Sequence, residues 1–531
     1  MIMSLITALL LSIFIAIVIT ENYGYGYWMV SRPIFAGPLV GLILGDVQTG
    51  LIVGGSVELM YMGILPIGGS VPPNAQIAGM LSTVFAIQNG GNPEVGITLA
   101  LPIGMLAQLL IMFAWNINIL LMHRADKYLA TGKTRKVELT HLSGILIFFI
   151  VFFIPSFLAV YYGSGFVNDV VAEMPALLMD GMRVASGILP AVGMAMLLKM
   201  MNMKKFWPLF MLGFVLATYL QLAVLPISLI GFSIAASLFL LNKKEKEMND
   251  EFVLDDDVVE EDAQPGILTK KELRQTFIRS FFSMTSINYE RYCSLGFAFA
   301  MIPALKKLYT NQEELNEALI RHNEFFNCHP YTGNAVLGVT LALEEQRAMG
   351  KPITAEAISS TKAALMGPLS GVGDSVFKAT FMTVFAAIGA GLALDGSILG
   401  PIIFIVPNVI LNIGSRWYFI KYGHKLGTSV VGKMKQGNLL DTFVEGATIV
   451  GMMVVGAMIV GFVRMPVAFI WNFGEKEIIV QELFDAILPC MLPLLITLGF
   501  YQILMKYKKG MYVCVVGSFV IGILGKVIGM F

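Results

Sequence analysis

Glu58 interrupts an apolar stretch of this sequence and is a first candidate for chemistry. It lies in GGSVELMYMG, near the glycines Gly54, Gly55 and Gly63, which break the apolar pattern into short pieces. A carboxylate in apolar surroundings costs free energy unless it is paired or used, so we interpret Glu58 as a binding-site residue. An ion pair with a nearby arginine, such as Arg32, is the structural alternative.

The segment GGSVPPNAQIAG adds uncharged amides to this carboxylate. Pro72 and Pro73 lack a backbone donor and impose an irregular backbone, and Asn74 and Gln76 follow them directly. Amides beside a carboxylate offer donors and acceptors with little net charge, which suits a polyhydroxyl ligand.

A second group of polar residues lies in the C-terminal half. SINYERYCSLG contains Asn288 and Glu290, although Glu290 is equally consistent with a structural pair to Arg291. EFFNCHPYTGN places Asn327 and His329 around a proline, and a single histidine in such a segment is either structural or part of a polar site.

LMGPLSGVGDS ends in Asp374, just before another apolar run. It lacks the GxGxxG and Walker spacings of phosphate-binding loops, so it predicts a broken hairpin. Asp46, in LGDVQTG, is interpreted as the cap of a helix that begins at Val47. The candidate ligand-binding residues are Glu58, Asn74, Gln76, Asn288, Glu290, Asn327, His329 and Asp374.

Composition places these residues in a membrane protein. Apolar residues make up 56% of the 531-residue chain and charged residues 14%, with 36 basic and 36 acidic side chains. A soluble domain carries about 25% charged residues. The balance excludes a basic nucleic-acid-binding protein and a disordered chain. The four cysteines lack CxxC or metal-ligand spacing, so we expect no disulfide framework, no metal site and no cofactor.

Residues 3–20 form an uncharged run long enough to cross a bilayer, without the basic start and cleavage site of a signal peptide. Shorter stretches broken by Gly or Pro, at 34–45, 51–65 and 75–88, predict re-entrant hairpins. Further spans are predicted at 97–121, 143–162, 206–224, 225–241, 379–394, 397–413, 443–462, 486–505 and 511–530.

An acidic segment at 242–266 divides the chain into halves 1–241 and 267–531. From Glu247 to Asp262 it holds nine acidic residues and no Lys or Arg, which predicts a solvated tether. A calcium site lacks the required ligand spacing with a central glycine. Within the second half, the polar part 267–366 predicts cytoplasmic or interfacial helices before a membrane part at 367–531.

Basic residues indicate the orientation. The loop 122–141 carries five Lys and Arg side chains, and further basic clusters precede the acidic segment and follow residue 505. Such clusters are typical of the cytoplasmic side, so we expect a cytoplasmic linker and a C-terminus outside.

Several long motifs resemble one family. RPIFAGPLVGLILGDVQTGLIVGGSVELMYMG and VPPNAQIA resemble the IIC membrane subunit of the mannose/fructose/sorbose family of bacterial sugar phosphotransferase systems (PTS). NYERYCSLGFAFAMIPALKKLY, RHNEFFNCHPYTG, GVTLALEEQRAMG and KAALMGPLSGVGDS resemble the IID subunit. These subunits are usually separate chains in the family. Three positions depart from the family pattern: Asn74 is often Asp, Cys328 usually Thr and Cys293 commonly Gln.

The resemblance implies an all-α polytopic membrane protein with two inverted pseudo-symmetric halves, broken helices and re-entrant hairpins. It implies a homotrimer in the bacterial cytoplasmic membrane, with an elevator-type core moving against a scaffold. The chain would bind a hexose of the mannose, glucose, fructose, sorbose or amino-sugar class and carry it inward. A phosphohistidine of a separate IIB subunit, charged through IIA and HPr, would phosphorylate the sugar; neither module is found in this sequence, so whether the chain itself counts as an enzyme stays open.

Under this resemblance the eight candidate residues surround the sugar hydroxyls. Two other functions stay open, a transporter that the residues allow and a receptor that the resemblance implies. Glu58 and Asp374 are also compatible with an ion-coupled secondary sugar transporter. The segment 463–485, with four acids, one Arg and one Lys, is compatible with an outside loop of a bacteriocin or phage receptor.

Overall fold

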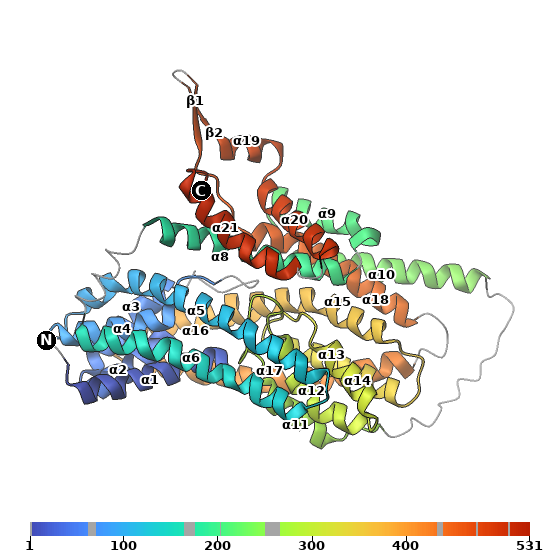
Figure 1. Ribbon diagram of the computed structural model, residues 1–531, viewed down its shortest axis with the longest axis horizontal. Coiled ribbons are helices and arrows are strands. Elements are labelled where there is room, and N and C mark those ends of the chain that lie inside the picture. The colour runs from blue at the N-terminus through green and yellow to red at the C-terminus, as the bar shows by residue number, and fades with distance from the viewer. Residues whose placement is uncertain are drawn as a thin grey trace.

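The computed structural model describes residues 3–61, 71–163, 176–201, 203–222, 224–249, 266–432, 439–473, 476–507 and 510–531. Its helices form two layers that lie side by side along the long axis of the molecule (Figure 1). Both halves of the chain contribute helices to both layers. Neither layer is therefore built from one half alone.

The first layer contains the N-terminal helices of each half. Within it α1 packs on α6, α3 packs on α16, and α14 packs on α17. Its first-half helices are α1 (Leu5–Gly24), α2 (Pro33–Leu44), α3 (Val47–Tyr61), α4 (Ala75–Gln88), α5 (Pro93–Leu129) and α6 (Thr134–Tyr162). Its second-half elements are α11 (Lys270–Ser280), α12 (Ser294–Leu308), α13 (Gln312–His322), α14 (Gly333–Ala348), α15 (Ala355–Gly373), the π-helix η1 (Asp374–Met382), α16 (Thr383–Leu394) and α17 (Leu399–Gly432).

The second layer contains the C-terminal helices of each half. Here α9 packs on α18, and α8 packs on α20 and α21. The helices are α8 (Ala176–Met200), α9 (Met203–Tyr219), α10 (Val224–Asn249), α18 (Leu439–Phe462), α20 (Met491–Lys506) and α21 (Gly510–Val527). A β-hairpin of β1 (Ile470–Phe473) and β2 (Lys476–Ile479) leads through α19 (Val480–Ile487) into α20. This hairpin is a departure from the all-α architecture expected from the sequence.

Helix α15 contacts both layers. It packs on α14 in the first layer and on α18, α10 and α8 in the second (Figure 1). Where it meets the second layer, Gly367 would place an added Cβ 3.5 Å from a methyl group of Val454. The layers therefore meet through α15 at van der Waals distance.

Close packing within the second layer depends on glycines at the α9–α18 crossing. An added Cβ on Gly456 would lie 2.2 Å from the carbonyl oxygen of Phe210, and one on Gly213 would lie 2.0 Å from that of Met453. Because real Cβ atoms cannot approach so closely, the two backbones meet at a distance that only glycine permits.

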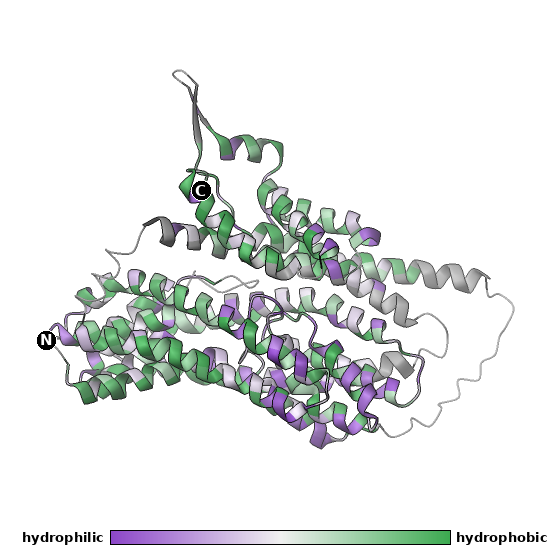
Figure 2. Cartoon of the chain, viewed as in Figure 1, coloured by the Kyte–Doolittle hydropathy of each residue, from purple (hydrophilic) through white to green (hydrophobic). Residues whose placement is uncertain are grey.

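Among the described residues, α1, α5, α6 and the Leu399–Gly427 part of α17 are long and apolar enough to cross a membrane. The bent pair α19–α20 becomes a fifth candidate if it is one broken span. Apolar residues cover much of both layers, while polar residues concentrate around α11–α14 (Figure 2). The assignment of 267–366 to a cytoplasmic or interfacial module stays a prediction.

The short apolar stretches of the first half are short helices, and local signals explain their ends. α2 begins with Pro33 and ends at Leu44, and Gly45 caps it with a φ of 83°, the left-handed conformation that favours glycine. Asp46 accepts from the backbone N–H of Thr49 at 3.0 Å and caps α3, as predicted. Asn74 caps α4 by accepting from the N–H of Ile77.

Candidate functional site

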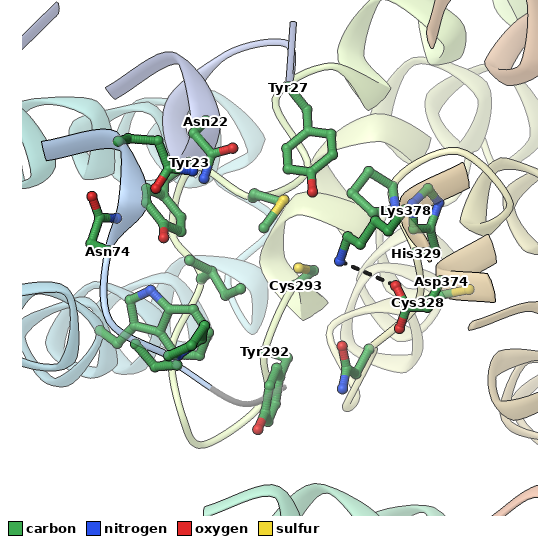
Figure 3. A pocket seen from close by; sticks show the side chains of 18 of the residues that line it. Asn22, Tyr23, Tyr27, Asn74, Tyr292, Cys293, Cys328, His329, Asp374 and Lys378 are labelled. Atoms are coloured by element: carbon green, nitrogen blue, oxygen red, sulfur yellow. Dashed lines mark ion pairs between the residues drawn. The ribbon is translucent and has the colours of Figure 1, made fainter. Parts of the chain in front are cut away.

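A cavity of about 90 Å³ lies between the two halves within the first layer (Figure 3). At about 10–15 Å³ per water it has room for several waters or a small polar molecule. Figure 3 shows Asn22, Tyr23, Tyr27 and Asn74 of the first half on one side, and Cys328, His329, Asp374 and Lys378 of the second half on the other. The polar, aromatic and sulfur side chains that line it are Asn22, Tyr23, Tyr27, Arg32, Asn74, Gln76, Trp115, Met284, Tyr292, Cys293, Asn327, Cys328, His329, Ser370, Asp374 and Lys378.

The end of α1 and the loop after it form one wall. Tyr27 has a φ of 59°, a left-handed conformation that is strained for a bulky residue. Two residues of the second half hold this loop: the N–H of Gly26 donates to the carbonyl of Phe281 at 2.7 Å, and Nδ2 of Asn412 donates to the carbonyls of Gly26 and Tyr27. The strain at Tyr27 is thus maintained by contacts across the two halves.

The segment before α4 is held along α5. The N–H of Asn74 donates to the carbonyl of Gly104 at 2.8 Å, and Nε2 of Gln108 donates to the carbonyl of Val71. Gly104 is required here, because an added Cβ would lie 2.0 Å from the hydroxyl of Tyr61. This packing brings the Asn74 and Gln76 side chains to the cavity.

The loop before α12 delivers Tyr292 to the cavity from the second half. Tyr292 has a φ of 51°, so both halves present a tyrosine on left-handed backbone. Asn288 closes this loop on itself: its Oδ1 accepts from the N–H groups of Glu290 and Arg291, and its Nδ2 donates to the carbonyl of Ser286. Asn288 therefore shapes the loop rather than facing the cavity.

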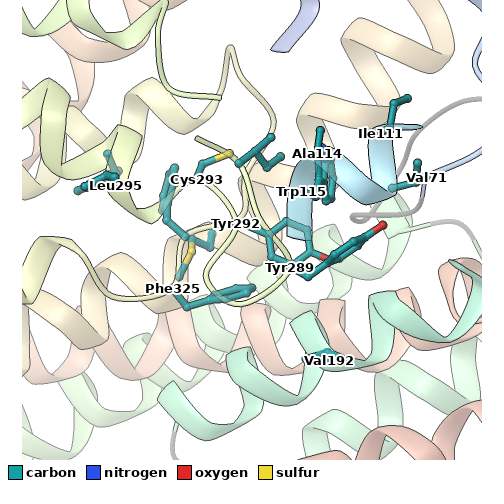
Figure 4. Packing of buried hydrophobic residues seen from close by; sticks show 14 of the residues in the cluster. Val71, Ile111, Ala114, Trp115, Val192, Tyr289, Tyr292, Cys293, Leu295 and Phe325 are labelled. Carbon is teal, nitrogen blue, oxygen red and sulfur yellow. The ribbon is translucent and has the colours of Figure 1, made fainter. Parts of the chain in front are cut away.

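An aromatic cluster supports the same wall. The Trp115 ring lies 4.9 Å from the ring of Tyr289 and 5.9 Å from that of Tyr292, measured between centroids (Figure 4). Tyr289 also contacts Phe519 of α21 at 6.4 Å, edge to face. This loop therefore links the cavity wall to the second layer.

The loop between α13 and α14 carries Asn327, Cys328 and His329, and a buried carboxylate anchors its start. Glu344 accepts from Tyr309, from Arg321 at 2.9 Å and from Nε2 of His322 at 2.7 Å. Burial alone would raise the pKa of Glu344, but these partners outweigh it and hold the pKa at about 2. Burial lowers the pKa of His322 to about 4, so His322 is the neutral donor to an ionised Glu344.

A buried lysine holds the next residues of this loop. Nζ of Lys362 donates to the carbonyls of His322 and Glu324 at 3.2 and 3.3 Å and lies 4.6 Å from the centre of the Phe297 ring. Burial is the main reason why the pKa of Lys362 falls to about 7. The loop is thus fixed just before the residues that reach the cavity.

The π-helix η1 supplies a charge pair to the cavity wall. Nζ of Lys378 lies 3.1 Å from Oδ1 of Asp374, and both side chains are almost fully buried. π-Helical turns are rare and occur often at functional sites. The pair brings a cation and an anion to the site with no net charge.

Of the eight residues predicted for the site, five line the cavity: Asn74, Gln76, Asn327, His329 and Asp374. The structure places the other three outside its lining. Glu58 is fully buried and paired with Arg32, which was the alternative considered for it, and Arg32 itself reaches the cavity. Their roles toward a ligand stay predictions.

Glu290 faces α5 instead of the cavity. Its Oε2 lies 2.9 Å from Nε2 of His123, while Arg291 makes a bidentate pair with Asp126. Burial raises the pKa of Glu290, and the nearby charges of His123 and Arg291 oppose that shift. Together with Asn288, it belongs to the structure that holds the loop.

Sequence reasoning missed several residues that line the cavity: Asn22, Tyr23, Tyr27, Arg32, Trp115, Tyr292, Ser370 and Lys378. Tyr23 and Tyr27 follow the first apolar run, a position typical of interfacial aromatic residues in membrane proteins. Lys378 had a usable signal, because it is a single cation in the otherwise uncharged stretch SVFKATFMTVFAAIGAG.

The arrangement suits recognition of a neutral polar ligand. Amides, an imidazole and paired charges provide donors and acceptors, and aromatic rings provide flat apolar surface. Within the described parts of the chain no group of three or more His, Cys, Asp or Glu side chains is arranged to hold a metal ion.

Comparison with known proteins assigns each half separately. Residues 267–531 match the family model "PTS system mannose/fructose/sorbose family IID component", and residues 5–237 match "PTS system sorbose-specific iic component". The mannose-specific EIID component of Escherichia coli K12 is 41% identical over 270 residues, covering 50% of this chain and 95% of that protein.

A IIC component and a chain of a solved structure are also similar to parts of this chain. The N-acetylgalactosamine permease IIC component 1 of Escherichia coli K12 is 36% identical over 229 residues, covering 42% of this chain and 85% of that protein. A chain from the cryo-EM structure of the mannose transporter ManYZ in complex with microcin E492 is 39% identical, with a TM-score of 0.47, and covers 50% of this chain and 98% of that one.

Each relative thus corresponds to one half, and the two halves together account for both membrane components. With its apolar spanning helices the chain is an integral protein of the bacterial cytoplasmic membrane. It belongs to the mannose/fructose/sorbose family of sugar phosphotransferase systems, as a single chain that joins a IIC and a IID component.

Proposed function

We propose that this chain is the sugar-translocating membrane component of a PTS permease. It binds a hexose in the cavity between its halves and carries it inward, where a phosphohistidine IIB partner phosphorylates it. IIA and HPr supply the phosphoryl group to IIB. The observation that carries the proposal is the cavity itself, because residues of the IIC and IID halves line it jointly with neutral or charge-balanced polar groups.

Each group in the cavity has a role suited to a sugar. The amides of Asn74, Gln76 and Asn327 can donate to one hydroxyl and accept from another, and Asp374 can accept from a hydroxyl while paired with Lys378. Glu58 acts through Arg32, whose guanidinium it holds at the cavity. Asn288 and Glu290 position the loop that presents Tyr292.

The two layers support an elevator-type motion. The sugar cavity lies within the first layer, which we assign as the moving core, and the second layer is the scaffold. Helix α15 contacts both layers and lies directly before Asp374 in the sequence. A shift of the core along the scaffold would therefore pass through α15.

We further propose a homotrimer, with 1–241 and 267–531 as inverted pseudo-symmetric halves, a cytoplasmic linker and a C-terminus outside. The basic turn between α5 and α6 supports this orientation. It packs against the polar module, since Gly132 lies against the amide of Gln312 on α13. Basic turns of this kind are typical of the cytoplasmic side, where IIB would bind.

Transport in proteoliposomes tests the function. The purified chain is reconstituted with phosphoenolpyruvate, enzyme I, HPr and the cognate IIA and IIB proteins, and supplied with radiolabelled D-mannose, D-glucose, D-fructose or L-sorbose. We expect at least one sugar to accumulate as its phosphate only when phosphoenolpyruvate and IIB are both present. Uptake that needs an ion gradient and continues without phosphoenolpyruvate would overturn the proposal in favour of a secondary transporter.

Variants connect the transport to the cavity. Asn327→Ala removes an amide from the lining and should abolish most uptake. Gln502→Ala removes an exposed amide on α20, away from the cavity lining, and should leave uptake unchanged. Equal uptake by both variants would exclude Asn327 as a sugar ligand.

A further inference from the structure

Two buried N–H donors of the cavity wall make no hydrogen bond within the part of the chain that the structure describes. Nε1 of Trp115 and Nε2 of His329 are inaccessible to solvent and make no hydrogen bond to the described residues. Trp115 is 4% exposed and His329 is 2% exposed, and both line the cavity. A buried donor without a partner destabilises the folded protein, so two such donors in one cavity wall indicate a ligand that accepts from both.

The tautomer of His329 follows from its other nitrogen. The backbone N–H of Tyr331 donates to Nδ1 of His329 at 3.2 Å, so Nδ1 carries a lone pair. The neutral ring therefore carries its proton on Nε2. His329 Nε2 is consequently a donor, like the indole N–H of Trp115.

Both rings are fixed by aromatic neighbours. The His329 ring stacks on Phe377 at 5.6 Å and meets Tyr331 edge to face at 4.9 Å. Trp115 is held between Tyr289 and Tyr292. Because packing fixes both rings, the donor positions are preorganised before any ligand arrives.

The two donors come from different halves of the chain. Trp115 belongs to α5 of the IIC half, and His329 belongs to the loop before α14 of the IID half. The charged groups beside them, Lys378 and Asp374, are already paired with each other. The ligand is therefore met at these two points by neutral donors.

We propose that Trp115 and His329 are specificity-determining residues of the sugar site, and that each donates a hydrogen bond to a separate oxygen of the bound sugar. This rests on the proposed function and names the ligand atoms it requires: a hydroxyl or ring oxygen that accepts at both positions. A protonated amine cannot accept, so an amino sugar that places its ammonium at either position is excluded.

Equilibrium binding to the full chain in lipid nanodiscs tests the donors. The probe is the radiolabelled sugar among D-mannose, D-glucose, D-fructose and L-sorbose that binds the wild type most tightly. Trp115→Phe keeps an aromatic ring and loses the N–H, and His329→Leu loses the imidazole. We expect each to raise Kd by about 5- to 10-fold, as for the loss of one buried neutral hydrogen bond.

Matched variants separate the donors from general packing. Thr276→Val removes another buried polar atom that makes no hydrogen bond to the described residues, but from α11 and outside the cavity lining, and should leave Kd unchanged. His329→Gln places an amide N–H near the position of Nε2 and should bind within about 2-fold of the wild type, whereas His329→Asn places it near Nδ1 and should bind like His329→Leu. Equal Kd values for the Gln and Asn variants would overturn the assignment of Nε2.

Monodeoxy analogues of the same sugar identify the accepting oxygen. One analogue should bind the wild type about 5- to 10-fold more weakly and lose nothing further in Trp115→Phe, because its partner is already gone. Additive losses for every analogue would overturn the Trp115 contact. If no sugar binds the wild type, the proposed function fails. If sugar binds the wild type and all of these variants with the same Kd, only the assignment of the two donors is overturned.

Discussion

The ammonium of Lys378 lies 3.1 Å from the carboxylate of Asp374, one turn earlier on η1, and both line the cavity between the halves. Because both are buried, removing one charge leaves the other uncompensated. We expect Lys378→Met to lower the free energy of unfolding by about 3–5 kcal/mol, and the double change with Asp374→Asn to recover most of that loss. Thermal unfolding of the purified variants measures both effects.

An exposed pair provides the control. Nζ of Lys205 lies 2.8 Å from Oε1 of Glu445, with side chains that are 60% and 40% exposed. Lys205→Met should change stability by only about 0–1 kcal/mol. If Lys205→Met and Lys378→Met lower the free energy of unfolding by similar amounts, burial of the Lys378–Asp374 pair does not increase its contribution to stability.

The ion pair between Arg32 and Glu58 predicts a coupled effect on stability and binding. Glu58→Gln leaves the buried guanidinium of Arg32 without its counter-ion, so we expect a lower unfolding temperature together with weaker sugar binding. Binding isotherms and unfolding curves on the same samples check this. A variant that loses sugar affinity at unchanged stability would instead make Glu58 a direct ligand.

The Glu344 cluster predicts sensitivity to acid. The pKa of His322 is about 4 in the folded protein, below its ordinary 6.5, so the unfolded chain takes up the proton first and stability falls as the pH drops from 6.5 to 4. The pKa of Glu344 is about 2, below its ordinary 4.5, so its contribution is complete above pH 4.5 and is lost below. Both groups act in the same direction.

Unfolding temperatures measured between pH 7 and pH 4 test this cluster. The His322 contribution over that range is on the order of 3 kcal/mol. His322→Gln keeps an N–H donor for Glu344 and removes the titration, so its curve should be flatter than that of the wild type. Parallel curves for the two proteins would contradict the prediction.

The α9–α18 crossing predicts unequal effects for two glycines of one helix. Gly456→Ala places a methyl group against the carbonyl of Phe210, so it should cost about 1–3 kcal/mol through separation of the helices. Gly461→Ala, near the end of the same helix, meets no atom within 4 Å and should be neutral or slightly stabilising. Equal unfolding temperatures for the two variants would refute the close approach.

We predict that sugar binding requires both halves of the chain. The relatives correspond to single halves over most of their own length, and here each half contributes to both layers. We expect residues 1–241 and 267–531, coexpressed as two chains, to associate and bind sugar. Neither half alone should bind, and binding by one half alone would contradict a shared cavity.

Much of the helical pattern could be predicted because its signals are local. Gly and Pro divide the first half into the short helices α2, α3 and α4, and the side chain of Asp46 caps α3 as its position predicts. The polar start of the second half likewise forms helices. Such features depend on neighbours within a few residues, which the sequence displays directly.

The candidate site was harder to predict because side-chain direction depends on tertiary contacts. Asn288 and Asn327 are both amides in broken segments, yet one closes its own loop and the other lines the cavity. Trp115 is an aromatic residue on a long apolar helix, and nothing nearby in the sequence shows that its N–H makes no hydrogen bond to the described residues. That property appears only when α5 meets the loop of the second half.

The division of each half between two layers also sets an order for biogenesis. During synthesis α8 to α10 leave the ribosome before any of α18, α20 and α21 exist, although these are the helices on which they pack. The surface of α9 that packs against Gly456 therefore lacks its partner helix until more than two hundred further residues have been synthesised. In a fused chain α9 and α18 are covalently linked, so their correct pairing does not depend on the encounter of two separately made proteins.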